Sequence, residues 1–159
     1  IAEALANYVA RVAEKLRKQQ SVAGGIEIWL GTNSFSKTDT RYFPRISTRC
    51  DVPTDFTPYL IKLAIEALKS IYKTGFKYKR VGIMLIDIRG KCDGTLNMFH
   101  SVNRDKQDKV IYQLDRINMI NGRDTLKSAQ QGFSSNWKMK QNHLSPKYTT
   151  KLSDIIQIN

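Results

Sequence analysis

Two kinds of apolar periodicity alternate along this chain, and their order most constrains its fold. Residues 1–20 and 55–75 place apolar side chains at helical spacing, whereas residues 26–30 and 41–50 alternate with a period of two. Residues 81–88 are apolar at almost every position, which is typical of a strand at the centre of a sheet. The order helix, strand, strand, helix, strand predicts an α+β fold, with an antiparallel-rich sheet and two helices on one face.

Glycine and proline suggest where these elements end. Gly24 and Gly25 form an expected break between the first helix and the first strand, and Gly75 is expected to end the second helix. Pro44 cannot donate a ladder hydrogen bond, so we expect residues 41–50 to lie at a sheet edge or to carry a bulge.

The second half of the chain is different in character. Residues 91–107 are mostly polar and lack periodicity, which indicates a linker, and residues 108–121 form a third helical pattern that ends at Asn121-Gly122. We therefore expect a domain at 1–90, a linker at 91–107, and a small helical or irregular region at 108–159.

Charge points to the class of partner. Lys and Arg number 26 against 14 Asp and Glu, a net charge of +12, so a polyanion is expected, with nucleic acid ahead of an anionic membrane. Two cysteines suit a reducing, cytoplasmic setting, and no apolar run is long enough to span a membrane. The first residue is Ile1 and not Met, so we expect the chain to be part of a longer protein.

Three arginines at intervals of four are the main candidate for anion binding. Alternation places Arg41, Arg45 and Arg49 on one face of the predicted strand, about 13 Å apart at ~3.3 Å per residue. Three like charges on one face repel one another, and phosphates along a nucleic-acid backbone would relieve that repulsion. The alternative is a solvated outer face that blunts an edge strand.

Further basic and aromatic residues extend this hypothesis. Lys77, Lys79 and Arg80 cluster at the start of the third strand, where a solvated turn is the alternative interpretation, and Lys37 lies in the polar stretch before residues 41–50. Trp29 shares a strand face with Glu27 and is expected either to stack on a base or to cover the sheet edge.

The sequence lacks a pattern typical of catalysis or metal binding. The acidic residues are scattered, and the two histidines lie far from each other and show no metal-ligand spacing with either cysteine. Residues 31–38 nearly match a phosphate-binding loop, but Ser36 replaces its second glycine and a strand follows where a helix is needed. We expect no active site and no cofactor in these residues.

Residues 94–99 place an apolar anchor within the polar linker. Leu96 and Phe99 are three residues apart, as in short linear motifs that fill a hydrophobic groove. The alternative is a linker segment that packs on its own domain.

The last residues carry a family resemblance. Trp137 and Met139, followed by the string LSPKYTT from Leu144, resemble the C-terminal end of the UmuC family, the catalytic subunits of bacterial DNA polymerase V and their plasmid relatives. Residues 114–132 resemble the segment that precedes these motifs in that family.

The resemblance implies a function for the first part of the chain. Residues 1–90 would be the little-finger domain of a Y-family translesion polymerase of the SOS response, whose sheet holds primer–template DNA. That domain usually begins with a strand, which is missing before residue 1, so an unpaired sheet edge is expected. The palm and fingers would lie outside this chain, so we expect no catalysis by it, although the whole polymerase would use Mg²⁺.

The resemblance also implies protein partners. The sliding-clamp motif of the family would fall on Thr95, Leu96, Asn97, Met98 and Phe99, with Thr95 in place of glutamine and Met98 in place of leucine. The tail would help to contact the UmuD′ dimer and the RecA filament, with Trp137, Met139 and Tyr148 in its core. The alternative is that the chain is mainly a protein-interaction module that binds little DNA itself.

Overall fold

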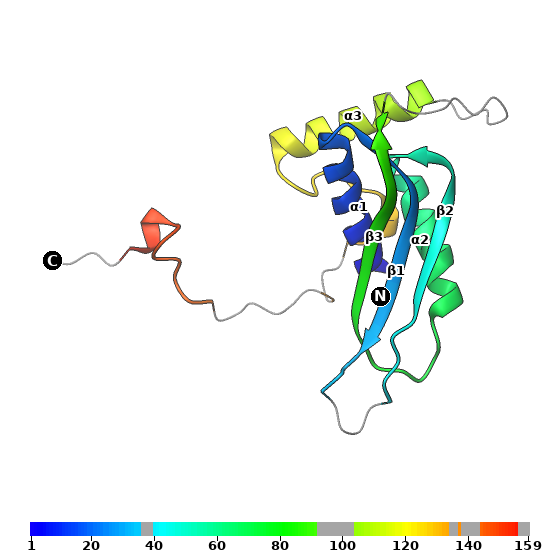
Figure 1. Ribbon diagram of the computed structural model, residues 1–159. Helices are drawn as coiled ribbons and strands as arrows, with labels where there is room; N and C mark the ends of the chain where they lie inside the picture. Colours follow the sequence, from blue (N-terminus) through cyan, green and yellow to red (C-terminus); the bar gives the residue numbers. More distant parts are fainter. Residues whose placement is uncertain (36–39, 92–103, 134–136, 138–143, 156–159) are drawn as a thin grey trace.

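The computed structural model describes the chain except for residues 36–39, 92–103, 134–136, 138–143 and 156–159. The predicted order of elements and the α+β class are confirmed (Figure 1). The elements are α1 (Ala2–Lys18), β1 (Ser21–Thr32), β2 (Arg45–Thr54), α2 (Thr57–Ile71), β3 (Tyr78–Gly90), α3 (Arg104–Asn121), and the short 3₁₀ helices η2 (Ala129–Gln131) and η3 (Leu152–Asp154).

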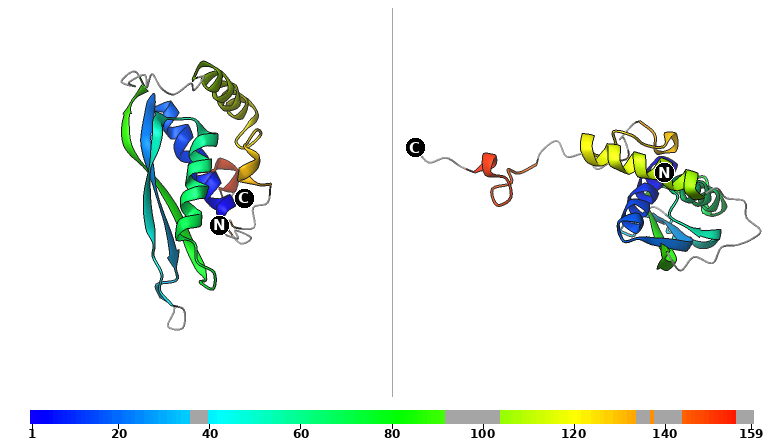
Figure 2. Two further views of the ribbon diagram at one scale, coloured as in Figure 1. Left: turned by 90° about the vertical axis from the view of Figure 1, so that its right-hand side faces the viewer. Right: turned by 90° about the horizontal axis from the view of Figure 1, so that it is seen from above.

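The three strands form one antiparallel sheet in the order β2-β1-β3. Helices α1 and α2 cover one face, as predicted, and no element that the structure describes covers the other (Figure 2, left). The prediction that residues 81–88 form the central strand was wrong, because β1 occupies that place. β3 carries apolar residues on both faces although the helices cover only one of them. Met84 points away from the helices and is 47% exposed.

The core lies between the sheet and the two helices. Ile26, Ile28 and Leu30 point inward from β1 and are fully or almost fully buried. Burying each such side chain contributes about 1.5–3 kcal/mol of transfer free energy. They pack with Leu5, Val9, Ala13, Leu60, Ile61, Ala64 and Leu68 of the helices.

Gly24 and Gly25 lie inside β1, so the predicted break at these residues was wrong. A Cβ on Gly25 would lie 2.8 Å from the backbone oxygen of Thr48, and one on Gly24 would overlap the side chain of Asp87. The pairing of β1 with β2 shifts register between Ala23 and Gly25, so the glycines accommodate a bulge where strands approach closely. The strand therefore starts earlier than its alternating pattern indicated.

β2 is an edge strand among the described residues, as Pro44 predicted. Before it, the chain still runs beside β1, since Leu30 and Thr32 donate backbone hydrogen bonds to the oxygens of Pro44 and Tyr42. Helix α2 ends earlier than its glycine predicted. Tyr72 is its C-cap, and Gly75 (φ 89°) lies in the turn to β3 and not at the helix end.

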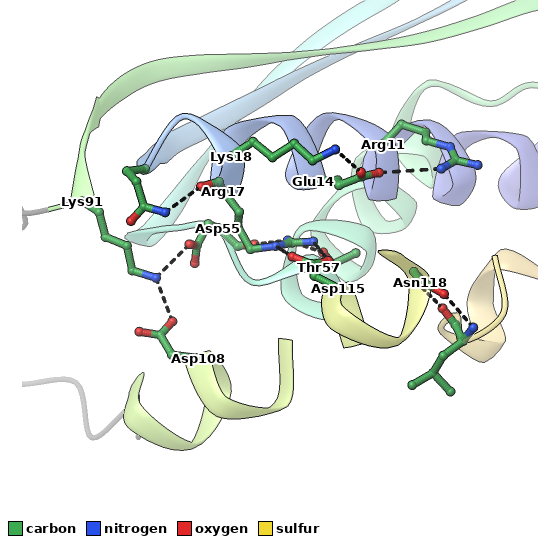
Figure 3. Close-up of polar contacts among 12 residues, drawn as sticks. Arg11, Glu14, Arg17, Lys18, Asp55, Thr57, Lys91, Asp108, Asp115 and Asn118 are labelled. Carbon is green, nitrogen blue, oxygen red and sulfur yellow. Dashed lines mark hydrogen bonds and ion pairs between the residues drawn. The ribbon is translucent and has the colours of Figure 1, made fainter. Parts of the chain in front are cut away.

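The C-terminal region docks on α1 largely through polar contacts (Figure 3). The Arg17 side chain is only 11% exposed, and it donates to both carboxylate oxygens of Asp115 on α3, at 2.6 and 2.8 Å. Its Nη1 also donates to the Asp55 backbone oxygen and to Thr57 Oγ1. One guanidinium thus joins α1, the start of α2 and α3.

A second link joins the end of the sheet to α3. Lys91 Nζ lies 3.0 Å from Asp55 Oδ2 and 2.9 Å from Asp108 Oδ1 (Figure 3). Partial burial opposes the charged form of Lys91, but the hydrogen bonds to these two carboxylates outweigh it and raise the pKa of the lysine.

Further contacts continue the docking beyond α3, which starts at Arg104 and not at residue 108 as predicted. Asn7 Nδ2 donates to the backbone oxygen of Gln131 at 2.7 Å, and Arg11 pairs with Asp124 at 2.9 Å. Among the described residues of α3, Ile111 alone is buried.

Two expectations about the core of the tail were not met. Trp137 makes an edge-to-face contact with Tyr8 of α1, with ring centroids 5.6 Å apart, so it packs on the first domain. Tyr148 is 49% exposed, in a turn whose hydrogen bonds to Asp154 are local. Met139 lies outside the described residues.

Replacing Arg17 by Ala should destabilise the chain by about 3 kcal/mol, since a buried charge pair is broken and the Asp55 and Thr57 acceptors lose their donor. Urea unfolding measures this free energy. Lys18→Ala is the matched control, because Lys18 is 70% exposed and its pair with Glu14 contributes at most about 0.5 kcal/mol. Equal losses for the two variants would show that Arg17 does not join the regions.

Candidate nucleic-acid interface

The sheet face opposite α1 and α2, here called the outer face, gathers most of the predicted phosphate-binding residues. Because Ile26, Ile28 and Leu30 point inward, the residues between them point outward, and paired residues on neighbouring strands share a face. The outer face is formed by Glu27 and Trp29 of β1, Arg45, Ser47 and Arg49 of β2, Arg80 and Met84 of β3, and, in the extended segment before β2, Arg41 and Phe43.

The three predicted arginines are exposed and in phase. Exposure alternates residue by residue from Arg41 to Arg49, although Arg41 lies in the extended segment before β2 and not in the strand itself. Within the described part of the chain, Arg41 and Arg49 have no carboxylate partner, whereas Arg45 Nη1 lies 3.1 Å from Glu27 Oε1. The three cations are therefore not equivalent.

Glu27 lies opposite Ser47 on the outer face and contacts both Ser47 and Arg45 of β2. Its side chain is 14% exposed, and its Oε2 accepts a hydrogen bond of 3.0 Å from Ser47 Oγ. Its other oxygen accepts no well-aligned hydrogen bond and is compensated by the ion pair with Arg45. The sequence placed Glu27 beside Trp29, but it did not show the contact across the strands.

Trp29 supports the side chain of Arg45 from below. The indole lies against Gly82 of β3, where an added Cβ would overlap the ring. The Arg45 guanidinium lies over the indole, 5.8 Å from the ring centroid. The expectation that Trp29 covers a sheet edge was wrong, since β1 is central. Its contacts favour support of Arg45 over stacking on a base.

The second basic cluster lies partly on the same face. Arg80 pairs with Gly31 across β1 and β3, two residues from the pair of Trp29 with Gly82, so Arg80 and Arg45 lie at the same end of the sheet. Lys77 and Lys79 are exposed beside it. Lys37 and the segment Thr95–Phe99 lie outside the described residues, so their predicted roles stay predictions.

Aromatic and aliphatic surface lies among these cations. Phe43 is half exposed and lies over Gly31, where an added Cβ would come within 3.0 Å of its ring, and Met84 projects from β3. The outer face thus combines cations with flat apolar surface along three strands. Such a surface suits a polyanion that offers both phosphates and sugars.

The described residues offer little for other chemistry. They contain no group of three or more His, Cys, Asp or Glu side chains that could hold a metal ion. Burial raises the pKa of Cys50 to about 11, with the Asp51 charge adding to the effect, so this thiol stays protonated at neutral pH. None of the helices in the described part has the length and apolar character needed to cross a bilayer.

Two family models match separate parts of the chain. The impB/mucB/samB family C-terminal domain matches residues 1–98, and Domain of unknown function (DUF4113) matches residues 108–158. The first covers the whole sheet and both packed helices, and the second covers most of α3 and the tail.

Several bacterial proteins that are longer than this chain have similar sequences. Protein UmuC of Salmonella typhimurium is 32% identical over 98% of the chain and 37% of its own length. Protein SamB of Salmonella typhimurium and protein MucB of Escherichia coli are each 32% identical, over 96% and 93% of the chain. The chain spans just over a third of these relatives, and no solved structure matches it significantly.

Proposed function

Because this chain belongs to the impB/mucB/samB family, we propose that it is the C-terminal part of a translesion DNA polymerase and that its outer face binds primer–template DNA. In this proposal, residues 1–90 are the little-finger domain, residues 91–107 are a linker, and residues 108–159 are a C-terminal region. The observation that carries the proposal is the sheet face that no described helix covers and that gathers Arg41, Arg45, Arg49 and Arg80.

The chemistry of the outer face favours contacts with the DNA backbone. Guanidinium groups bind phosphate oxygens, and each phosphate that they neutralise releases counterions without regard to sequence. The net charge of +12 adds attraction at longer range. A polymerase that copies many templates needs backbone contacts of this kind, which have little base specificity.

The linker would supply a second attachment. We assign sliding-clamp binding to Thr95–Phe99, where Leu96 and Phe99 would fill a hydrophobic groove and Thr95 lacks the amide of the family's glutamine. Tethering to a clamp raises the local concentration of the polymerase at a primer end without new contacts there.

The remaining parts of the proposal concern the whole protein. The catalytic carboxylates and the Mg²⁺ of the polymerase are assigned to residues outside these 159, so this chain is not expected to catalyse nucleotide incorporation by itself. The UmuD′ dimer and the RecA filament are proposed partners of the C-terminal region.

A second candidate function is a protein-interaction module that binds little DNA. It is favoured by the exposed apolar side chains of α3, where Tyr112, Met119 and Ile120 project away from the docked surface. Binding of the clamp or of UmuD′ in the absence of measurable DNA affinity would distinguish this function from the first.

The salt dependence of DNA binding tests the outer face. The variant Arg41→Ala/Arg49→Ala should bind a labelled primer–template duplex more weakly and flatten the slope of log K against log salt by up to ~1.8, since each lost phosphate contact contributes about 0.9. Fluorescence anisotropy over a range of salt concentrations measures both quantities.

The matched control removes two lysines from the helix side. Lys62 and Lys69 are exposed on α2, so Lys62→Ala/Lys69→Ala makes the same change in net charge away from the sheet. Equal slopes for the two double variants would mean that net charge and not the outer face governs binding.

The clamp assignment has its own test. Leu96→Ala with Phe99→Ala should abolish binding to the sliding clamp in surface plasmon resonance, because both groove-filling side chains are lost, and should leave duplex affinity unchanged. Thr95→Gln should tighten clamp binding. Clamp affinity that is unaffected by the double substitution would refute the motif.

A further inference from the structure

The outer face contains a carboxylate that phosphate binding does not call for. Glu27 lies on the central strand, and its side chain is largely buried beneath its neighbours, with 14% exposure. Ser47 donates a hydrogen bond to Oε2, and Arg45 lies 3.1 Å from Oε1. A fixed negative charge is thereby built into a surface that otherwise gathers cations.

The same contacts restrain Arg45. Glu27 holds its Nη1, Trp29 lies beneath its guanidinium, and Gly82 leaves room for the indole. The Arg45 side chain is nevertheless 65% exposed. A phosphate can therefore approach the outer side of the guanidinium while Glu27 stays bound to the inner side.

Glu27 makes such a phosphate contact weaker. The carboxylate neutralises much of the charge of Arg45, and it also repels the phosphate itself. For two partly exposed charges about 7 Å apart, the interaction corresponds to a change in affinity of about threefold to tenfold. Arg41 and Arg49 have no carboxylate partner among the described residues, so the attenuation is specific to Arg45, the middle arginine of the three.

We propose that Glu27 is a built-in counter-charge that lowers the affinity of the outer face for duplex DNA, acting on the phosphate contact of Arg45. This inference rests on the proposed DNA-binding function and adds a residue that sets its strength. The charge of Glu27 holds Arg45 in place in the free protein, and it limits what that arginine gains from a phosphate in the complex.

Glu27→Gln tests the inference with little change in shape, because the amide oxygen still accepts from Ser47. The variant should bind the labelled primer–template duplex about threefold to tenfold more tightly, and the slope of log K against log salt should steepen by up to ~0.9. Glu27→Thr, which is neutral and suited to a strand, repeats the test if the glutamine variant does not fold.

Glu66→Gln is the matched control. Glu66 is exposed on α2, on the far side of the helix layer from the outer face, so the same change in net charge is made away from the proposed DNA site. Its effect on duplex affinity should be smaller than that of Glu27→Gln.

The outcomes separate the inference from the function on which it rests. Unchanged or weaker binding by both Glu27 variants would overturn it, as would equal tightening by Glu66→Gln. If Arg41→Ala/Arg49→Ala still weakened binding, the DNA-binding function would stand in either case. If the unaltered chain bound no duplex at all, the function and the inference would fall together.

Discussion

The burial of one face of a three-stranded sheet is the constraint on which the rest of the structure depends. Ile26, Ile28 and Leu30 of the central strand are buried against α1 and α2. Because side chains alternate between the two faces of a strand, Glu27 and Trp29 lie on the opposite side. The C-terminal region docks on the helix layer that closes the core. Arg17 joins α3 to α1 through Asp115, and Lys91 joins α3 to the end of the sheet through Asp108. Helices α1, α2 and α3 therefore all lie away from the outer face (Figure 2).

The same constraint explains why the cations of the outer face differ from one another. Arg49 and Arg45 lie on one edge strand, but only Arg45 reaches the indole and the carboxylate of the central strand. Arg80 approaches the same end of the sheet from β3, on the other side of β1. A polyanion laid along β2 would thus meet exposed charges at Arg41 and Arg49, with the restrained and partly neutralised Arg45 between them.

The fold was predictable from the sequence because its elements carry strong local patterns, as α1, α2 and the alternation from Arg41 to Arg49 illustrate. The position of β3 in the sheet was not predictable, because its apolar sequence is the same whether Met84 is covered or exposed. Gly24 and Gly25 misled for a related reason, since the close approach of Asp87 and the Thr48 carbonyl is a tertiary contact. The exposure of Arg41, Arg45 and Arg49 on one face was likewise predictable from spacing, whereas the pair of Glu27 with Arg45 depends on the register between β1 and β2.

NMR titration of the ¹⁵N-labelled chain with a primer–template duplex tests most directly whether DNA lies on the outer face of the sheet. If it does, the largest shifts will fall on the Trp29 indole N–H and on the side-chain Nε–H groups of Arg45 and Arg49, while the amides of α2 change little. Shifts confined to α2 and α3, with the signals of Trp29 and Arg45 unmoved, would contradict it.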